Sequence, residues 1–153
     1  MRTKFSVSKV LVWSLVLAIC LGITSVLAQQ RPGKSLYQRL GGYDAIAAVA
    51  DDFIGRLAGD PMFTKFFGGF STDSKKKLRQ HLVEQICGAA GGPCIYIGRS
   101  MKDTHAGLGI TEKEWDAGGK HLIAAMDKFN VPKQEKDEVM AFVATLKKDI
   151  VEK

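Results

Sequence analysis

Apolar residues recur at three- and four-residue steps along most of the chain, which is the spacing of amphipathic helices. Four such stripes can be traced: Ile46, Val49, Phe53 and Leu57; Leu78, Leu82, Ile86 and Ala89; Trp115, Leu122, Ile123, Met126 and Phe129; and Val139, Phe142, Val143, Leu146 and Ile150. Only the short run Cys94 to Ile97 resembles the alternation of a strand. The pattern predicts an all-α domain with four substantial helices.

Glycine and proline mark the breaks between these stripes. Gly41-Gly42, Gly68-Gly69, Gly91-Gly92-Pro93 and Asn130-Val131-Pro132 fall between or beside them. The third helix is opened by Thr111 and Glu114 in capping-box spacing, and Pro132 is expected in the first turn of the fourth. The segment from Pro93 to Gly109 fits no helical period, so we predict an irregular stretch there.

The N-terminal segment has the pattern of an export signal. Three basic residues precede an apolar stretch from Val10 to Leu21, and small residues with Val26 and Ala28 at the −3 and −1 places form an A-x-A-like cleavage site. We therefore expect a signal peptide at 1–28, a polar linker at 29–34 and the domain at 35–153. An uncleaved membrane anchor is the alternative. Both place the domain outside the cytoplasm, in the periplasm or the extracellular space.

Charge argues against nucleic acid as a partner. The chain has a formal net charge of +6, from 22 basic and 16 acidic residues. Three of those basic residues belong to the N-terminal segment, and the rest of the sequence shows no basic face.

Two cysteines remain after the predicted signal, Cys87 and Cys94. In an oxidising compartment they can form a disulfide across a short loop, but two small buried thiols explain them equally well. Their C-x6-C spacing is not a zinc-binding pattern.

Chemistry is most expected in the irregular stretch, which holds His105 within the run Met101 to Thr111. Four helices with apolar faces can enclose a flat apolar cofactor, and a neutral imidazole beside it is a suitable iron ligand. A single histidine near a helix start is, on composition alone, more often a cap or a surface residue.

From Ser35 onward the sequence resembles the group 1 truncated haemoglobins. The resemblance rests on an ordered set of motifs: Leu36 to Gly42, Phe66-Phe67, Gly91-Gly92-Pro93 followed by Tyr96 and Gly98, Met101 to Thr111, Gly119 to Leu122, and Val131-Pro132. It implies a two-over-two helical sandwich around haem b with His105 as the proximal iron ligand. No C-x-x-C-H run is present for covalent c-type attachment.

The resemblance also implies which residues line the cofactor, and here the distal side departs from the family. Ile54 follows Phe53 where many members have tyrosine, and Leu82 stands where glutamine is common. A ligand with partial negative charge therefore meets no donor from these two positions. The expected lining consists of Phe53, Ile54, Phe66, Phe67, Leu78, Leu82, Ile86, Tyr96 and Met101.

His81 is the polar candidate on the distal side, on the flank of the stripe through Leu78 and Leu82. Some members of the family use a histidine here as a sixth iron ligand. His81 can ligate iron, donate a hydrogen bond to a ligand or a haem propionate, or simply face solvent in a lysine-rich helix.

We therefore expect a protein that binds O2, NO or CO at haem iron. The alternatives are a bis-histidine electron carrier or redox and gas sensor using His105 and His81, and an enzyme such as a nitric oxide dioxygenase or a peroxidase-like protein. Dioxygenation requires an external reductase, because the sequence has no flavin or nicotinamide motif.

Overall fold

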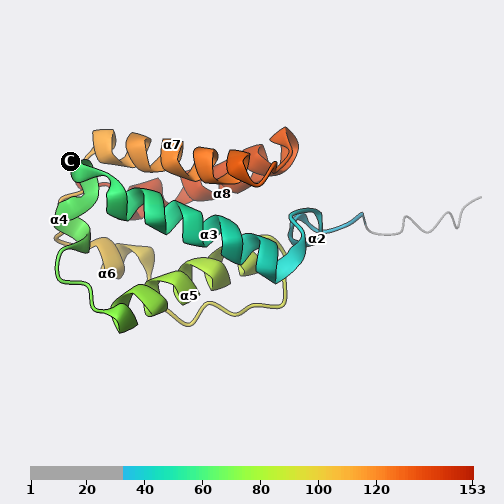
Figure 1. Ribbon diagram of the computed structural model, residues 1–153, viewed down its shortest axis with the longest axis horizontal. Helices are drawn as coiled ribbons and strands as arrows, with labels where there is room; N and C mark the ends of the chain where they lie inside the picture. The colour runs from blue at the N-terminus through green and yellow to red at the C-terminus, as the bar shows by residue number, and fades with distance from the viewer. Residues whose placement is uncertain (1–32) are drawn as a thin grey trace, which may run out of the picture. The chain divides into compact units, whose positions relative to one another are not determined.

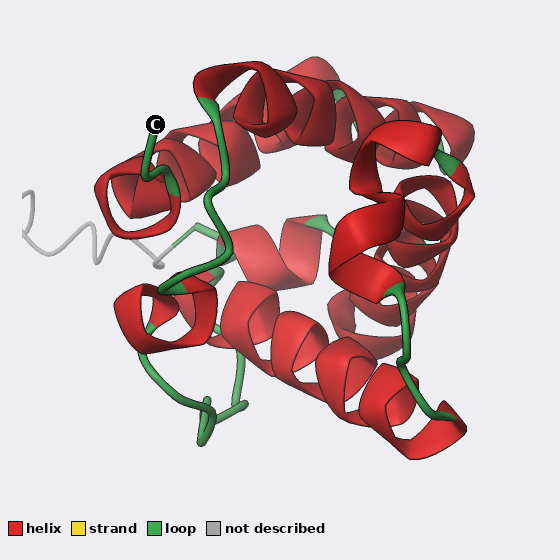
Figure 2. Cartoon of the chain, turned by 90° about the vertical axis from the view of Figure 1, so that its left-hand side faces the viewer, coloured by secondary structure: helices red, strands yellow, loops and turns green. Residues whose placement is uncertain are grey.

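A computed structural model describes residues 33–153, and within this range every regular element is a helix (Figure 2). In chain order the elements are α2 (Leu36–Arg39), α3 (Gly42–Gly59), the 3₁₀ helix η1 (Pro61–Phe63), α4 (Thr64–Phe67), α5 (Thr72–Ala89), α6 (Met101–His105), α7 (Glu112–Lys128) and α8 (Lys133–Ile150). The all-α prediction is confirmed. The predicted signal peptide or anchor lies outside the described residues, as does most of the predicted linker.

The four long helices follow the four apolar stripes. α3 packs against both α5 and α7, while α8 packs against α7 and the short α6 (Figure 1). One buried cluster between α3 and α5 includes Ile46, Ala50 and Val83, and a second includes Leu122 and Met126. The core is therefore built around α3, whose two faces serve the two clusters.

Local signals at the helix ends are mostly as the sequence predicts. Thr111 and Glu114 form the expected capping box at the start of α7. Pro132 is the residue before α8 rather than part of its first turn, because its extended backbone (ψ 155°) does not continue into the helix. The last residue of the third stripe is less buried than predicted. Phe129 is 42% exposed, because it follows the last turn of α7.

The predicted irregular stretch is wrong in one part, because it contains α6. The Ser100 hydroxyl accepts a hydrogen bond from the Asp103 N–H and begins this five-residue helix, which ends at His105. A helix of little more than one turn presents no repeated apolar stripe, so periodicity could not reveal it.

Cys87 and Cys94 form a disulfide, with their Cα atoms 5.7 Å apart. The bond joins the last turns of α5 to the segment that leads toward α6. Gly92 lies inside this loop, and a Cβ atom there would come within 2.5 Å of the Tyr37 ring and 2.7 Å of the Cys87 sulfur. Only glycine fits this position, which gives a physical reason for the Gly91-Gly92-Pro93 motif.

None of the helices in residues 33–153 combines the length and the apolar character that a membrane-spanning helix needs.

Candidate functional site

His105 is held in one orientation by its own helix. Its Nδ1 lies 2.8 Å from the Met101 carbonyl oxygen, one turn earlier in α6. Because a carbonyl only accepts, Nδ1 carries the proton and Nε2 keeps its lone pair. The structure gives Nε2 no hydrogen-bond partner among the described residues. His105 therefore has the form of a metal-ligating imidazole whose tautomer is set by a backbone carbonyl.

The chain directly after His105 is tied to the C-terminal residues. The N–H groups of Gly107 and Gly109 each donate to the Glu152 carboxylate over 2.6 Å. Both glycines have positive φ, 79° and 64°, which side chains other than glycine rarely adopt. The Glu152 N–H also donates to the Ile110 carbonyl over 2.8 Å. Glu152 thus fixes the path of the loop that leaves His105.

Five of the apolar side chains predicted to line the cofactor lie on three helices. Phe66 and Phe67 belong to α4, Leu78 and Leu82 to α5, and Met101 to α6, and all five are only partly buried. Figure 1 shows α4, α6 and the start of α5 toward the same end of the fold. A set of large apolar side chains left half-covered by the protein suits a flat apolar group that would complete their burial.

Three other predicted lining residues have different surroundings. Ile86 is buried in the cluster between α3 and α5, and Phe53 packs against the cluster that contains Leu122. Ile54 is half-buried on α3. Ile86 and Phe53 therefore serve the core directly, and their contact with a cofactor stays a prediction.

His81 differs from His105 in its contacts. Its side chain is 39% exposed, and its Nδ1 lies 3.6 Å from the Glu84 carboxylate. The Tyr96 ring meets the His81 ring edge-on, with centroids 5.7 Å apart. Tyr96 donates its hydroxyl hydrogen to the Arg99 carbonyl over 2.6 Å, and burial raises the pKa of that hydroxyl. Tyr96 thus connects α5 with the residues that begin α6.

An ion pair fixes α4, which carries Phe66 and Phe67. Lys65 lies 2.7 Å from the carboxylate of Glu114, a residue that is only 8% exposed. The hydrogen bond from Lys65, followed by that from the Thr111 N–H, lowers the pKa of Glu114 from 4.5 to about 2. The sequence identifies Glu114 as a cap, but not as the partner of Lys65.

His121 has a structural role. Its Nε2 lies 2.7 Å from the Asp60 carboxylate, and its ring packs edge-on against Phe63. The hydrogen bond from His121 lowers the pKa of Asp60. Since Asp60 also caps η1, this pair joins α7 to the turn after α3.

Exposed basic side chains that could meet an anionic group lie on α5 and around the start of α6. Lys75, Lys76 and Lys77 are exposed in the first half of α5, and Arg99 and Lys102 are exposed at the start of α6. The three lysines form a solvated face of α5.

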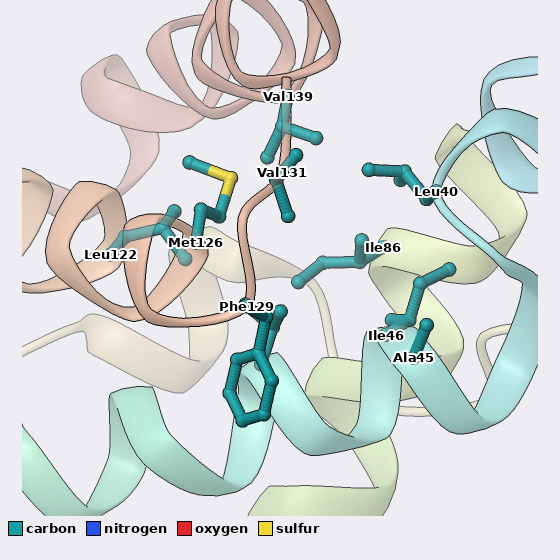
Figure 3. A pocket seen from close by; sticks show the side chains of 10 residues that line it. Leu40, Ala45, Ile46, Ile86, Leu122, Met126, Phe129, Val131 and Val139 are labelled. Carbon is teal, nitrogen blue, oxygen red and sulfur yellow. The ribbon is translucent and has the colours of Figure 1, made fainter. Parts of the chain in front are cut away.

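A separate apolar pocket of about 190 Å³ lies within the core (Figure 3). Its lining includes Leu40, Ile46, Ile86, Leu122, Met126 and Val139, from α3, α5, α7 and α8 and the turn after α2. His105 is not part of this lining. The pocket has room for small molecules such as diatomic gases but lies apart from the candidate metal ligand.

No cluster of three or more histidine, cysteine or acidic side chains suited to a bare metal ion occurs in residues 33–153.

Comparison with known protein families gives a match to the bacterial-like globin family over residues 35–152. Among curated proteins, the chain is 36% identical to the group 1 truncated hemoglobin GlbN of Nostoc sp. over 119 residues, which cover 78% of this chain and 98% of the relative. It is 32% identical to the corresponding protein of Mycolicibacterium paratuberculosis over 127 residues, which cover 82% and 91%.

Solved structures agree on the fold. Truncated hemoglobin from Tetrahymena pyriformis in the Fe(III) form superposes with a TM-score of 0.71 at 24% identity, covering 78% of this chain and all of that one. The 2/2 hemoglobin of Synechococcus sp., in the cyanomet state and with covalently attached heme, gives a TM-score of 0.65 at 30% identity, covering 72% and 91%.

Proposed function

The chain belongs to the group 1 truncated haemoglobins, and on this premise we propose that it holds haem b through His105 and binds a diatomic gas. The observation that carries the proposal is the Nδ1 contact of His105 with the Met101 carbonyl, which leaves Nε2 as the ligating nitrogen. When bound, haem would supply an iron able to take O2, NO or CO as a ligand.

The residues around His105 suit this cofactor. Phe66, Phe67, Leu78 and Leu82 offer apolar surface to the porphyrin, and Arg99 and Lys102 offer cations to its propionates. Distal Ile54, Leu78 and Leu82 carry no hydrogen-bond donor, so a ligand with partial negative charge gains little from these residues. We therefore propose that O2 is released readily.

A second role, in which His81 competes with the gas for iron, is supported by one contact. The His81 ring lies against Tyr96, whose hydroxyl is fixed to Arg99 at the start of the helix that carries His105. Tyr96 therefore links His81 to Arg99, two residues before the helix that carries His105. Ligation by both would favour electron transfer or sensing over simple gas binding.

Export is part of the proposal. The Cys87–Cys94 disulfide supports it, because such bonds persist in oxidising compartments and are rare in the cytosol. The N-terminal sequence of the protein recovered from the producing cell tests it: a start at Gln29 supports a cleaved signal peptide, and an intact Met1 in a membrane fraction supports the anchor.

Visible spectroscopy of purified ferric and ferrous protein tests the main proposal, with His105→Ala and His81→Ala as matched variants. We expect the wild type to bind haem in a 1:1 ratio, His105→Ala to lose it, and His81→Ala to keep it. Sharp low-spin ferrous bands that become five-coordinate in His81→Ala would assign His81 as the sixth ligand. A wild-type chain that takes up no haem on reconstitution would refute the proposal.

A further inference from the structure

We propose that Ile95 and Ile97 dock the domain on an anionic lipid surface, together with the lysines at the start of α5. The two isoleucines, called the isoleucine ridge below, are each 78% exposed, whereas the other exposed large apolar side chains in residues 33–153 lie between 38% and 43%. Covering apolar side chains that are held in water lowers the free energy of the system. The inference goes beyond gas binding and does not depend on haem.

The isoleucine ridge points away from the helices because the segment before α6 is extended. Cys94, Tyr96 and Gly98 are half-buried, while the two residues between them, Ile95 and Ile97, are exposed. Successive side chains of an extended chain point to opposite sides. Because the Tyr96 ring packs against a histidine of α5, the ridge lies on the outer side of the segment. A cofactor in contact with Tyr96 would therefore leave the ridge uncovered.

The segment that carries the isoleucine ridge is fastened to α5 at two points. The disulfide joins Cys94 to Cys87. A Cβ atom at Gly88 would lie 3.2 Å from the Cys94 carbonyl oxygen, so the two backbones are close. Two residues later, the Tyr96 ring meets the His81 ring edge-on, with centroids 5.7 Å apart. These contacts hold the isoleucines outward, so the ridge is preorganised for a partner.

The same contacts show that the segment runs antiparallel to α5, toward the lysine-rich start of that helix (Figure 1). Cys94 lies beside Gly88, near the end of α5. Tyr96 lies beside His81, about two turns earlier in the helix. Residues 97–99 therefore continue toward the turn before His81, which carries Lys77 on the same face of the helix. The isoleucine ridge and the first turns of α5 thus belong to one side of the domain.

The start of α5 supplies the positive charge that binds an anionic surface. Residues 75–77 are all lysines, and all three are exposed. Within residues 33–153 only one of them, Lys76, has an acidic partner, Asp73 at 3.7 Å. The cations proposed for the haem propionates, Arg99 and Lys102, are different residues. Each lysine close to an anionic membrane adds to binding, and its contribution falls off within a Debye length.

Two features favour a lipid surface over a second copy of the chain. A specific protein interface involves about 20 to 30 residues on each side, whereas the isoleucine ridge consists of two. In a symmetric dimer the same surface patches meet, so the lysines beside the ridge would face like charges. A membrane interface needs no large complementary surface, because apolar side chains enter the headgroup region while cations bind lipid phosphates.

Cosedimentation with lipid vesicles tests the proposal, using residues 29–153 so that the apolar N-terminal stretch cannot itself bind lipid. Residues 34–153 form one compact unit, and the matching region makes up 98% of the Nostoc relative, so this part folds without the N-terminal segment. Vesicles of phosphatidylcholine alone are compared with vesicles that also contain phosphatidylglycerol. The wild type should bind the anionic vesicles and remain largely unbound with the others.

Ile95→Ser/Ile97→Ser removes the isoleucine ridge, and Ile123→Ser on α7 is the control for loss of an exposed isoleucine. We expect the ridge variant to bind anionic vesicles roughly ten-fold more weakly, because two apolar side chains no longer leave water on binding. The control should bind as the wild type does. Circular dichroism of both variants should show unchanged helix content.

Lys75→Gln/Lys76→Gln/Lys77→Gln removes the charge at the start of α5. This variant should also bind roughly ten-fold more weakly, and added salt should reduce the difference from wild type. The matched control removes the same charge from α7 and α8, by glutamine substitutions at the exposed Lys113, Lys120 and Lys148. Its binding should fall much less, because these lysines do not lie beside the isoleucine ridge.

Equal binding of the wild type to both kinds of vesicle, or a ridge variant that binds as the wild type does, would overturn the proposal. A wild-type dimer that becomes a monomer in the ridge variant, measured by sedimentation velocity, would also overturn it, since the ridge would then pair with a second copy. None of these measurements involves iron. Failure to bind haem would therefore refute the proposed function without deciding this inference.

Discussion

His105 and His81 are both half-buried histidines on helices, yet their surroundings differ in one decisive respect. The ring of His105 is fixed by a backbone carbonyl of its own short helix. The ring of His81 faces a carboxylate oxygen at 3.6 Å with no hydrogen bond made. A carbonyl in a helix cannot turn away, whereas two side chains can separate. The comparison teaches that the partner of the ring nitrogen, rather than the residue type, decides how firmly each imidazole is oriented.

The comparison predicts its largest effect on haem retention when each imidazole is removed by substitution with glycine. We expect His105→Gly to lose haem, with free imidazole in the buffer restoring part of the Soret absorbance, because only the ligand and not the fold is missing. We expect His81→Gly to retain haem without imidazole. Haem retention in His105→Gly without added imidazole would show that another group holds the iron.

The next largest effect should come from removing the disulfide that joins α5 to the segment before α6. Replacing both Cys87 and Cys94 by alanine opens a short loop, since the two cysteines are seven positions apart, and should lower the free energy of unfolding by about 2 to 3 kcal/mol. Urea unfolding with and without reductant measures this. Reductant should lower wild-type stability similarly and leave the double variant unchanged, and a large effect of reductant on the variant would contradict the assignment.

The proposed distal role of α5 can be tested by adding a hydrogen-bond donor at Leu82. Leu82→Gln should slow O2 dissociation roughly ten-fold, the equivalent of about 1.4 kcal/mol for one new hydrogen bond to the ligand. Leu82→Met is the matched control, because it preserves volume without a donor, and should leave the rate within about two-fold. Stopped-flow displacement of O2 by CO gives the rates. Equal slowing by both variants would indicate an effect of packing.

The smallest effect concerns the ion pair that fixes α4. The folded-state pKa of Glu114 is about 2 against an ordinary value of 4.5. The unfolded chain therefore binds more protons between these values, so the contribution of Glu114 is full above pH 4.5 and is lost as pH falls toward 2. Lys65→Met should lower stability at pH 7 by less than about 1 kcal/mol, and this difference should shrink on acidification.

Urea midpoints at pH 7, 4.5 and 3 check this prediction. Lys133→Met is the control, since Lys133 pairs with Asp137 on the exposed face of α8. A Lys65→Met deficit that stays constant across this range would mean that Lys65 acts through packing rather than charge.

The long helices could be predicted from sequence because each carries a stripe of apolar residues over several turns. The start of α7 could be predicted as well, because a capping box is a local signal between Thr111 and Glu114. The role predicted for His105 came from an ordered set of family motifs rather than from the periodicity of apolar residues. α6 itself was missed, since a helix of five residues has no repeat to detect.

The contacts around the candidate site could not be predicted from the sequence, for a different reason. Glu152 reaches Gly107 across 45 positions, and Lys65 reaches Glu114 across 49 positions. Nothing local marks such partners among the many acids and bases of a charged surface. Glu84 lies within one turn of His81, but its unused oxygen became evident only from burial. For Cys87 and Cys94 the sequence likewise allowed either a disulfide or two buried thiols, and only their geometry distinguished the two.

The tie between Glu152 and the loop after His105 has a consequence for biosynthesis. During translation α6 leaves the ribosome well before Glu152, the residue that fixes the loop after His105. The loop therefore lacks the two Glu152 hydrogen bonds until residue 152 has been made and has folded back. Capture of haem by His105, in the role proposed for it, with this loop fully formed would accordingly follow synthesis of nearly the entire domain, which would make loading a late event in the life of the nascent chain.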